Sequence, residues 1–511
     1  MNAATPSPRQ PPAVYRVAAE DDVAVALRDL AANESIALQD RSLVVIEPIP
    51  RGHKVAIRAV ASGQSVRKYG WPIGRATADI AVGSHVHSHN LETLLRGTDD
   101  YEYVASAAAS ATPAPITPEL STQASFLGYR RANGKVGTRN EIWILCTVGC
   151  VGRTAERIAR MAAQKHAGRV DNVVAFPHQF GCSQLGGDLD RTRGLIAGLA
   201  RHPNAGGVLI LGLGCESNQL SKLLSGIPEA ERERIRYFAA QSIEDETEAG
   251  LQAVAELVAL AERDQRVPCG LNDLVVGLKC GGSDGFSGIT ANPLVGRIAD
   301  RVTAAGGTAV LTEIPEIFGA ERLLMERAAN REVFDGIVTI VNDFKEYFLR
   351  NNQPVHENPS PGNIAGGITT LEEKSLGAVQ KGGHAIVTQV LRYGERTTRP
   401  GLTLLEAPGN DGVSSTALVA AGATVLLFTT GRGTPLGFPV PTLKISSNST
   451  LAERKSHWID FDAGKALGAA DPEALTDEFL RLIVETASGR PARNEVNEQR
   501  EIAIWKDGVT L

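Results

Sequence analysis

A thiol, a hydroxyl and a carboxylate follow one apolar stretch in the second half of the chain. The run Val275–Cys280 ends in a cysteine, and two glycines separate it from Ser283 and Asp284. This pattern predicts a buried strand that brings the three groups into one tight turn. Ligands in open α/β sheets bind at the carboxyl ends of strands, where glycines let the backbone approach a bound group closely. The alternative is a glycine-rich turn in which Cys280 only packs.

Polar residues follow several other apolar runs in the same way. Examples are the run Val173–Phe176 and the runs that lead into GCE, APGND, TTGRGTP and SSN. Because strands alternating with helices indicate βαβ units and parallel sheets, we expect these polar ends to gather along one edge. The residues concerned are His178, Cys182, Cys215, Glu216, Asn410, Asp411, Thr430 and Arg432.

The residue types at these predicted strand ends suit a divalent transition metal. Imidazole and thiolate groups suit iron, and carboxylates suit iron or manganese. The three cysteines of the set could instead hold an iron–sulfur cluster with one open iron. For any single residue, the alternative is ordinary packing, capping or a structural ion pair. The candidate ligands are Cys182, Cys215, Glu216 and Cys280, with His178 and Asp284 beside them.

A polar, glycine-rich stretch at residues 356–377 offers hydrogen bonds and an ammonium group suited to a polyhydroxy acid. Lys374 and His178 are the candidates for a general base, and Asp284 is a further catalytic candidate. Arg432 could clamp a carboxylate with its planar fork, or be an ordinary surface arginine. The candidate substrate-binding residues are His53, Ser283, Asn363, Thr369, Thr370, Asn410, Asp411, Thr430 and Arg432.

Three histidines occupy alternate positions in the segment HVHSHN. His85, His87 and His89 share one face if this segment is extended, because side chains on a strand alternate with period two. Histidines with this spacing can bind a metal ion, and His85 and His87 are the candidate ligands. The alternative is a polar strand edge that faces solvent. His53 lies at a turn from which it could face a neighbouring domain.

The sequence divides into a tail, three domains and a linker. Residues 1–13 are rich in proline, serine and alanine and are expected to be disordered, and residues 106–125 have the composition of a linker. Short β-type runs between turn glycines predict a mostly β module at residues 14–105. Strands alternating with amphipathic helices predict α/β domains with largely parallel sheets at residues 126–268 and 269–511.

The composition argues against several classes of protein. A net charge of −6 without a basic stripe gives nucleic-acid binding little support. No segment approaches the roughly 18 apolar residues of a membrane-spanning helix, and the N-terminus lacks the apolar core of a signal peptide. Six cysteines in 511 residues do not form a small disulfide scaffold. We therefore expect a cytoplasmic protein that acts on a small molecule.

From about Tyr15 onward, a series of motifs in one order resembles a known family. The chain is similar to the altronate and galactarate dehydratases. This resemblance implies an α/β multidomain protein in which a small all-β SAF-type N-terminal module precedes two α/β domains with largely parallel sheets. The motifs are RGHKVAI, HVHSHN, YRRANGKVGTRNE, HQFGCSQL, GLGCE, CGGSDGFSGITANP, ENPSPGN, GGITTLEEKSLG, APGND and TTGRGTP.

The resemblance also implies a hydro-lyase of hexuronate catabolism. Such an enzyme dehydrates D-altronate to 2-dehydro-3-deoxy-D-gluconate, depends on Fe²⁺ that Mn²⁺ can replace, and forms a homodimer. The HVHSHN cluster favours altronate, because galactarate dehydratases share most of the other motifs and lack it. Independently, removing a proton beside a carboxylate creates a dianionic enediolate, which requires a metal or fixed donors. The alternatives are a galactarate or other sugar-acid dehydratase, carbon–sulfur lysis of a related hydroxy acid, and a sugar-acid binding protein without turnover.

Overall fold

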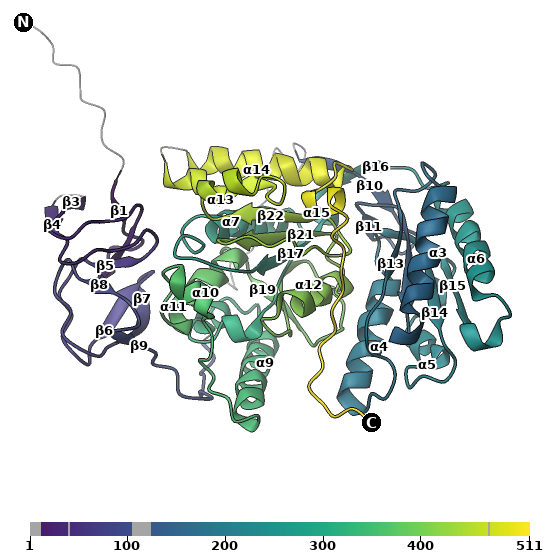
Figure 1. The fold of residues 1–511 in the computed structure, drawn as a ribbon, viewed down its shortest axis with the longest axis horizontal. Coiled ribbons are helices and arrows are strands. Elements are labelled where there is room, and N and C mark those ends of the chain that lie inside the picture. Colours follow the sequence, from purple (N-terminus) through teal and green to yellow (C-terminus); the bar gives the residue numbers. More distant parts are fainter. Residues whose placement is uncertain (1–11, 39–40, 105–123, 469–470) are drawn as a thin grey trace, which may run out of the picture.

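Three domains make up the described part of the chain, and the C-terminal domain lies between the other two (Figure 1). The all-β N-terminal module and the parallel sheets predicted from the sequence are confirmed. The predicted tail and linker lie almost entirely outside the described residues. None of the described helices is long and apolar enough to cross a membrane. The computed structural model describes residues 12–38, 41–104, 124–468 and 471–511.

The N-terminal module consists of short antiparallel strands around a small core. Val45, Val55 and Ile57 are fully buried in this core. The sheet order β1-β2-β5-β8 places His85 opposite Val55. The strands are β1 (Val14–Tyr15), β2 (Val23–Ala26), β3 (Ser35–Leu38), β4 (Arg41–Val44), β5 (Lys54–Ala56), β6 (Ser65–Lys68), β7 (Trp71–Ala76), β8 (His85–Val86) and β9 (Leu91–Glu92).

The second domain is a four-stranded parallel sheet in the order β13-β12-β14-β15. Because side chains alternate along a strand, Ile142 and Ile144 pack with α3 and α6, whereas Trp143 and Leu145 pack with α4. Both faces of the sheet are therefore buried. The elements are β12 (Glu141–Cys146), α3 (Gly152–Lys165), β13 (Val173–Phe176), α4 (Gly186–Ala200), β14 (Ala205–Gly212), α5 (Leu220–Ser225), β15 (Ile235–Ala239) and α6 (Glu246–Ala261).

The C-terminal domain is a seven-stranded parallel sheet in the order β19-β20-β18-β17-β21-β22-β23. An antiparallel ribbon of β10 (Ser125–Arg130), β11 (Val136–Gly137) and β16 (Val267–Gly270) flanks the second domain in the sequence. The strands of the large sheet are β17 (Val275–Cys280), β18 (Thr308–Leu311), β19 (Val387–Leu391), β20 (Gly401–Leu405), β21 (Val425–Thr430), β22 (Thr442–Ser446) and β23 (Phe461–Asp462). The helices are α7 (Ala291–Ala304), α8 (Arg322–Met325), α9 (Arg331–Arg350), α10 (Pro361–Ala365), α11 (Leu371–Ala378), α12 (Asp411–Ala420), α13 (Ser449–Arg454), α14 (Pro472–Ala487) and α15 (Arg493–Val496).

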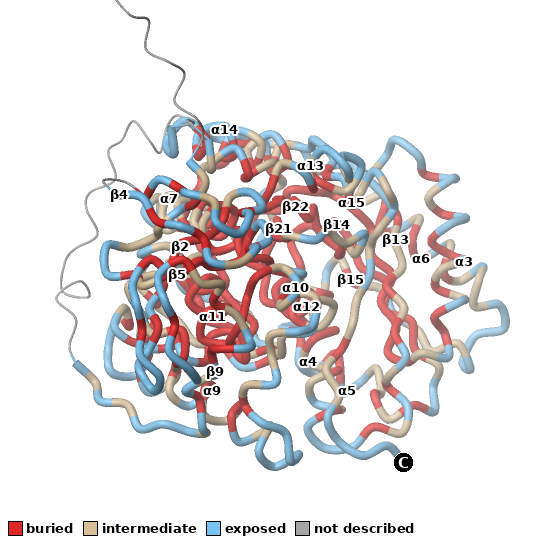
Figure 2. The backbone as a smooth tube through the Cα atoms, turned by 60° about the vertical axis from the view of Figure 1, so that its left-hand side comes forward, coloured by how far each residue is buried: buried red, intermediate tan, exposed pale blue. Residues whose placement is uncertain are grey.

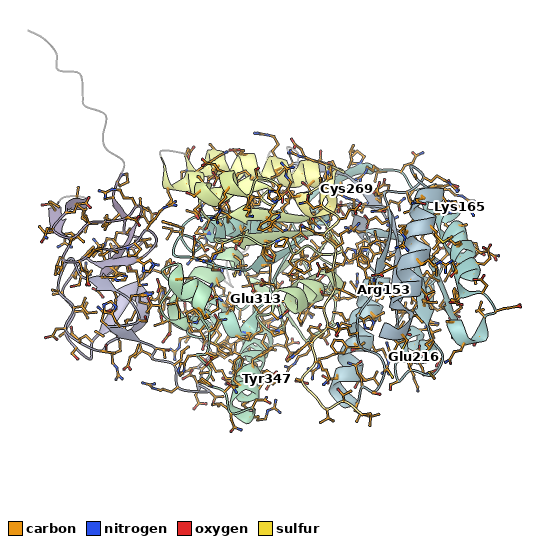
Figure 3. All side chains as sticks on the ribbon, viewed as in Figure 1. Arg153, Lys165, Glu216, Cys269, Glu313 and Tyr347 are labelled. Carbon is orange, nitrogen blue, oxygen red and sulfur yellow. The ribbon has the colours of Figure 1, made fainter. Side chains whose placement is uncertain are left out.

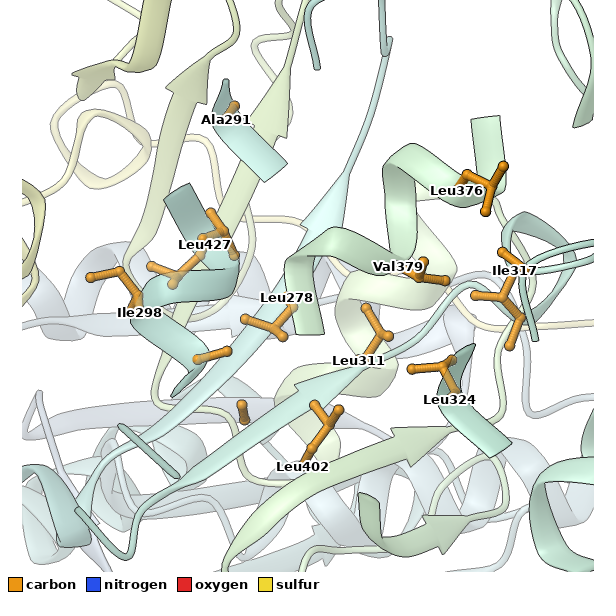
Figure 4. Packing of buried hydrophobic residues seen from close by; sticks show 14 of the residues in the cluster. Leu278, Ala291, Ile298, Leu311, Ile317, Leu324, Leu376, Val379, Leu402 and Leu427 are labelled. Carbon is orange, nitrogen blue, oxygen red and sulfur yellow. The ribbon is translucent and has the colours of Figure 1, made fainter. Parts of the chain in front are cut away.

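Apolar side chains cover both faces of the large sheet. On one face, Leu278, Leu311 and Leu427 of neighbouring strands pack with Ile298 of α7 (Figure 4). On the other face, residues of α12 join the core of the second domain through α4. Figure 2 shows the buried central strands β21 and β22 and the exposed residues on outer helices such as α3. The sheet is thus a rigid platform for the loops at its edge.

The strand order reverses direction at β17. From β17 the chain passes to β18 on one side of it, and β21 later pairs on its other side. Such a reversal leaves a crevice at the carboxyl ends of the strands, where ligands bind in open α/β sheets. The stretch that follows Cys280 therefore lies at the position most suited to a ligand.

A buried ion triad joins the β module to the C-terminal domain. Lys54 Nζ lies 2.8 Å from Glu373 Oε2, and Lys68 Nζ lies 2.8 Å from Glu373 Oε1. The three side chains are at most 2% exposed. Burial alone would raise the pKa of Glu373, but the two ammonium groups hold it at about 2. The ionised Glu373 therefore holds α11 against the module.

Replacing Glu373 with glutamine is expected to lower the free energy of unfolding by about 3–5 kcal/mol, because two buried ammonium groups lose their counter-charge. Urea denaturation followed by circular dichroism measures this change. Glu92→Gln is the control, since Glu92 pairs with Arg75 where their side chains are 44% and 42% exposed. An exposed pair of this kind contributes at most about 1 kcal/mol. Equal stability of the two variants would contradict the role of the triad.

Candidate functional site

The turn after β17 is tied to the end of β21. Gly281 N donates to Thr429 O at 3.0 Å, and Gly431 N donates to Gly282 O at 3.1 Å. Gly282 has a φ of +64°, and a Cβ on Gly281 would lie 2.6 Å from Asp411 Oδ2. Gly282 has the left-handed backbone that glycine adopts readily, and the surroundings of Gly281 leave no room for a side chain. The glycines therefore allow this turn to fold tightly into the crevice.

Cys280 lies in a buried group of acidic and basic side chains. Its Sγ lies 3.5 Å from Glu313 Oε2, 3.6 Å from Glu316 Oε2 and 2.7 Å from Lys381 Nζ. Burial, reinforced by Glu313, raises the pKa of Cys280 to about 12. The thiol is therefore protonated at neutral pH and donates toward the two carboxylates.

Two buried lysines neutralise Glu313. Lys381 Nζ lies 3.0 Å from Glu313 Oε2, and Lys279 Nζ pairs with Glu313 Oε1. Lys279 Nζ also lies 2.8 Å from Asp411 Oδ1. Burial alone would raise the pKa of Glu313, but the ammonium groups hold it at about 2. The group thus contains its own counter-charges.

Lys374 extends from α11 to the same group. Its Nζ lies 2.8 Å from Glu316 Oε1 and 2.9 Å from Asn358 Oδ1. Lys374 retains 8% exposure, whereas Lys279 is 0% and Lys381 is 1% exposed. Of the three lysines, Lys374 is therefore the most accessible to a bound molecule.

Cys280, Glu313 and Glu316 place ligand atoms within 4.8 Å of one another, as a metal site would. However, lysine ammonium groups contact the thiol and both carboxylates. A divalent cation here would have to displace these positive charges and the thiol proton. The group is therefore better suited to proton transfer than to binding a metal.

Three histidines of the β module form a second group. His53 Nδ1 lies 3.0 Å from His85 Nε2. The ring centroid of His87 lies 4.8 Å from that of His53 and 5.3 Å from that of His85. The ligand atoms of all three lie within 4.8 Å of one another. The structure thus adds His53 to the two predicted ligands and leaves His89 outside this group.

The histidine group fits a transition metal. Burial, followed by the neighbouring histidines, lowers the pKa of His85 to about 3, and burial and Lys54 lower that of His87 to about 4. Burial also lowers the pKa of His53. All three imidazoles are therefore neutral at pH 7, which is the form that binds metals. Two nitrogen ligands bound at right angles about 2.1 Å from an ion lie about 3 Å apart, as His53 and His85 do.

Both groups border residues 358–374 of the C-terminal domain. His53 Nε2 lies 3.4 Å from Ala365 O, and His87 Nδ1 lies 3.2 Å from Thr369 Oγ1. The two ends of the same segment, Asn358 and Lys374, contact Glu316. The β module therefore brings its histidines to the segment that leads into α11, the helix that carries Lys374.

Glycines permit this close contact between domains. A Cβ on Gly285 or Gly367 would lie 2.0 or 2.3 Å from Gly52 O. Because Gly52 immediately precedes His53, a larger residue at either position would push the histidine group away from the crevice.

His178 belongs to neither group. Its Nε2 lies 2.8 Å from Cys146 O, and its Nδ1 accepts a hydrogen bond of 3.1 Å from Phe180 N. Burial lowers the pKa of this histidine. Because backbone groups occupy both ring nitrogens, the contacts of His178 are structural and give the prediction of a base or ligand no support.

Cys182, Cys215 and Glu216 are separate from Cys280. They follow strands of the four-stranded sheet, whereas Cys280 ends a strand of the seven-stranded sheet. Figure 3 shows Glu216 in the second domain, away from Glu313. The structure therefore divides the predicted set between two sheets, each with its own carboxyl edge, and Cys280 does not lie on the edge that carries Cys182, Cys215 and Glu216.

Asp284 braces the turn after β17. Its Oδ1 accepts from Ser447 Oγ at 2.7 Å and from Ser287 N at 3.0 Å, and its Oδ2 accepts from Asn448 Nδ2 at 3.1 Å. These contacts join the ends of β17 and β22. Because both oxygens already have donors, the contacts of Asp284 are structural and give the prediction of a catalytic residue or ligand no support.

Several predicted substrate-binding residues also have structural partners. Asn363 forms a capping box with Ser360. Thr370 and Asn410 accept backbone hydrogen bonds at the starts of α11 and α12, and Thr430 Oγ1 accepts from a backbone amide. Asp411 pairs with a lysine, as described above. Thr369 Oγ1 accepts from Lys54 Nζ at 2.7 Å and lies 3.2 Å from His87 Nδ1. The remaining candidates are Ser283 and the exposed Arg432, whose Cβ lies 3.5 Å from the position of a Cβ on Gly282.

Glu313, Glu316 and Lys381 are not among the residues predicted from the sequence. The two glutamates follow the strand Thr308–Leu311 in the segment TEIPE. They are polar residues that follow an apolar run, which is the pattern that identified the other strand ends. Lys381 lies in a short 3₁₀ turn after α11, and no local pattern marks it.

Comparisons with known proteins cover nearly the whole chain. The C-terminal model described as D-galactarate/altronate dehydratase matches residues 271–510. A model described as D-galactarate dehydratase/altronate hydrolase, second domain, matches residues 128–262. The altronate/galactarate dehydratase SAF domain matches residues 12–94.

Three similar proteins are full-length matches. Altronate dehydratase of Escherichia coli (strain K12) is 50% identical over 97% of this chain and 99% of its own length. Altronate dehydratase of Bacillus subtilis (strain 168) is 49% identical over 96% of this chain and 98% of its own length. Galactarate dehydratase (L-threo-forming) of E. coli (strain K12) is 33% identical over 94% of each chain.

Proposed function

Because this chain belongs to the D-galactarate/altronate dehydratase family, we propose that it dehydrates D-altronate to 2-dehydro-3-deoxy-D-gluconate. Identity of about 50% to two altronate dehydratases, against 33% to a galactarate dehydratase, supports altronate as the substrate. The observation that supports the chemistry is that the three histidines of the β module and Lys374 of α11 both border residues 358–374. We further propose that the enzyme is a cytoplasmic homodimer.

We propose that His53, His85 and His87 hold the divalent ion. Fe²⁺ is the proposed metal, with Mn²⁺ as a substitute, since imidazole ligands suit iron. A bound ion would supply positive charge to stabilise the enediolate that forms beside the substrate carboxylate. The β module therefore completes the active site of the C-terminal domain.

Lys374 acts as the general base in this proposal. A proton passes from Lys374 Nζ to Glu316 Oε1, which lies 2.8 Å away, and the resulting amine takes the proton from C2 of altronate while Asn358 orients it. As the C3–O bond breaks, the Lys374 ammonium gives this proton to the departing hydroxyl, which leaves as water. The enol then tautomerises to the 2-keto acid. In this proposal the exposed guanidinium of Arg432 binds the substrate carboxylate.

Replacing Cys280 with serine is expected to lower kcat about 100-fold, or roughly 2.7 kcal/mol, with the fold intact. The shorter hydroxyl cannot keep the contacts of the thiol with Lys381 and both glutamates. Cys269→Ser is the control, since Cys269 is also buried but lies on β16. Steady-state assays of both variants measure the effect. An unchanged rate for Cys280→Ser would remove this residue from the site.

An anaerobic assay with Fe²⁺ tests the proposed function. Altronate, galactarate and other aldonates and aldarates are each supplied, and 2-keto acid formation is measured. We expect altronate to give the highest kcat/KM. Preference for galactarate would make the chain a galactarate dehydratase, and binding of altronate without any product would make it a sugar-acid binding protein.

A further inference from the structure

Three cysteines of the second domain share a local sequence and a place in the fold. Each follows a glycine and each is exposed, in the pairs Gly149–Cys150, Gly181–Cys182 and Gly214–Cys215. They come after β12, β13 and β14, which are adjacent parallel strands in the sheet order β13-β12-β14. All three thiols therefore lie at the same carboxyl edge. The other three cysteines of the chain are buried.

Hydrogen bonds tie the three cysteine loops together. Gly149 N donates to Phe180 O at 2.9 Å, which links the first loop to the second. Asn218 N donates to Gly181 O at 3.0 Å, and Asn218 Nδ2 donates to Thr147 O at 3.1 Å. The third loop is therefore bound to both of the others. These contacts hold the loops in one rigid unit.

The glycines are required by this packing. A Cβ on Gly149 would lie 2.8 Å from His178 O, and a Cβ on Gly181 would lie 2.0 Å from Thr147 O. Gly214 has a φ of +131°. A side chain at any of these positions would separate the loops or strain the backbone. The backbone is thus shaped to bring the cysteines together.

Two further features of this edge suit an anionic group. Gln184 Nε2 is a buried donor without a hydrogen-bond partner, on a residue that is 2% exposed. Buried amides normally have partners, so this donor points to a missing acceptor. Cys150 also lies just before the N-terminus of α3, where the helix dipole favours a bound anion.

A single ion does not fit the three thiols. Two thiolates on one tetrahedral zinc ion, each about 2.3 Å away, lie at most about 4.6 Å apart. Within the described ranges, only the histidine group and the Cys280 group place three ligand atoms within 4.8 Å of one another. An iron–sulfur cluster accepts wider spacing, because each thiolate binds a different iron. We therefore propose that Cys150, Cys182 and Cys215 bind an iron–sulfur cluster, separate from the divalent ion at the histidines.

Anaerobic reconstitution of the full-length protein with ferrous iron and sulfide tests this proposal. After desalting, iron, acid-labile sulfide and visible absorbance are measured. We expect the wild-type protein to retain about four sulfides per chain, and Cys150→Ser, Cys182→Ser and Cys215→Ser each to retain about tenfold less. Cys269→Ser and His85→Ala are expected to retain the wild-type amount. The sulfide measurement does not depend on dehydration, so failure of this proposal can be distinguished from failure of the proposed function.

Two results would overturn the proposal. One is a wild-type protein that retains no sulfide although circular dichroism shows it folded. The other is a full chromophore in any one of the three cysteine variants. Binding of zinc alone in a 1:1 ratio that the three variants lose would replace the cluster by a mononuclear site and would equally contradict it.

Discussion

Replacing Lys374 with methionine is expected to lower kcat for altronate dehydration by about 10³-fold. General acid–base catalysis by one side chain contributes about 10²–10⁴-fold, and methionine cannot take a proton. The methionine side chain resembles the lysine stem in length, so α11 should remain packed. Steady-state kinetics with altronate measure the loss, and the KM should change much less than kcat.

Lys374→Arg separates proton transfer from charge. Arginine keeps the positive charge beside Glu316 but cannot lose its proton near neutral pH. We therefore expect this variant to be about as inactive as Lys374→Met. If it kept more than about a tenth of the wild-type kcat, Lys374 would be an electrostatic partner and not the base.

Replacing His85 with alanine is expected to abolish binding of one divalent ion per chain and to lower kcat by roughly 10³-fold. A Lewis-acidic ion contributes several kcal/mol of stabilisation to the developing charge, which corresponds to that factor. Mn²⁺ binding followed by electron paramagnetic resonance measures the ion directly. In this variant, Mn²⁺ binding and kcat should both fall.

His89→Ala is the matched control for this prediction. His89 belongs to the same motif and its ring lies 5.4 Å from that of His85, but it is exposed and outside the group of three ligand atoms. We expect this variant to bind Mn²⁺ and turn over altronate like the wild type. Equal losses in both variants would mean that the motif acts through the fold of the module.

Local patterns in the sequence predicted the strands and the place of Cys280. Alternation of apolar runs and helices identified two parallel-sheet domains, and the glycines after Cys280 identified the turn at the strand-order reversal. The spacing of His85 and His87 predicted their shared face. These features depend on residues close together in the sequence.

Features that depend on distant residues were not predictable in this way. Packing over the whole chain decides which strands share a sheet. The sequence therefore did not show that β13 and β14 end at a different sheet edge from β17. Residue type alone suggested His178 and Asp284 as site residues, whereas some of their partners, such as Cys146 O and Ser447 Oγ, come from other segments of the chain. The contact of His53 with Ala365 spans 312 positions in the sequence.

A structure of the protein with Mn²⁺ and an altronate analogue, using anomalous scattering to locate the ion, tests the central claim most directly. The account predicts an anomalous peak bound by His53, His85 and His87, with the analogue between this ion and Lys374. A peak bound by Cys280, Glu313 and Glu316, with the histidines empty, would contradict it.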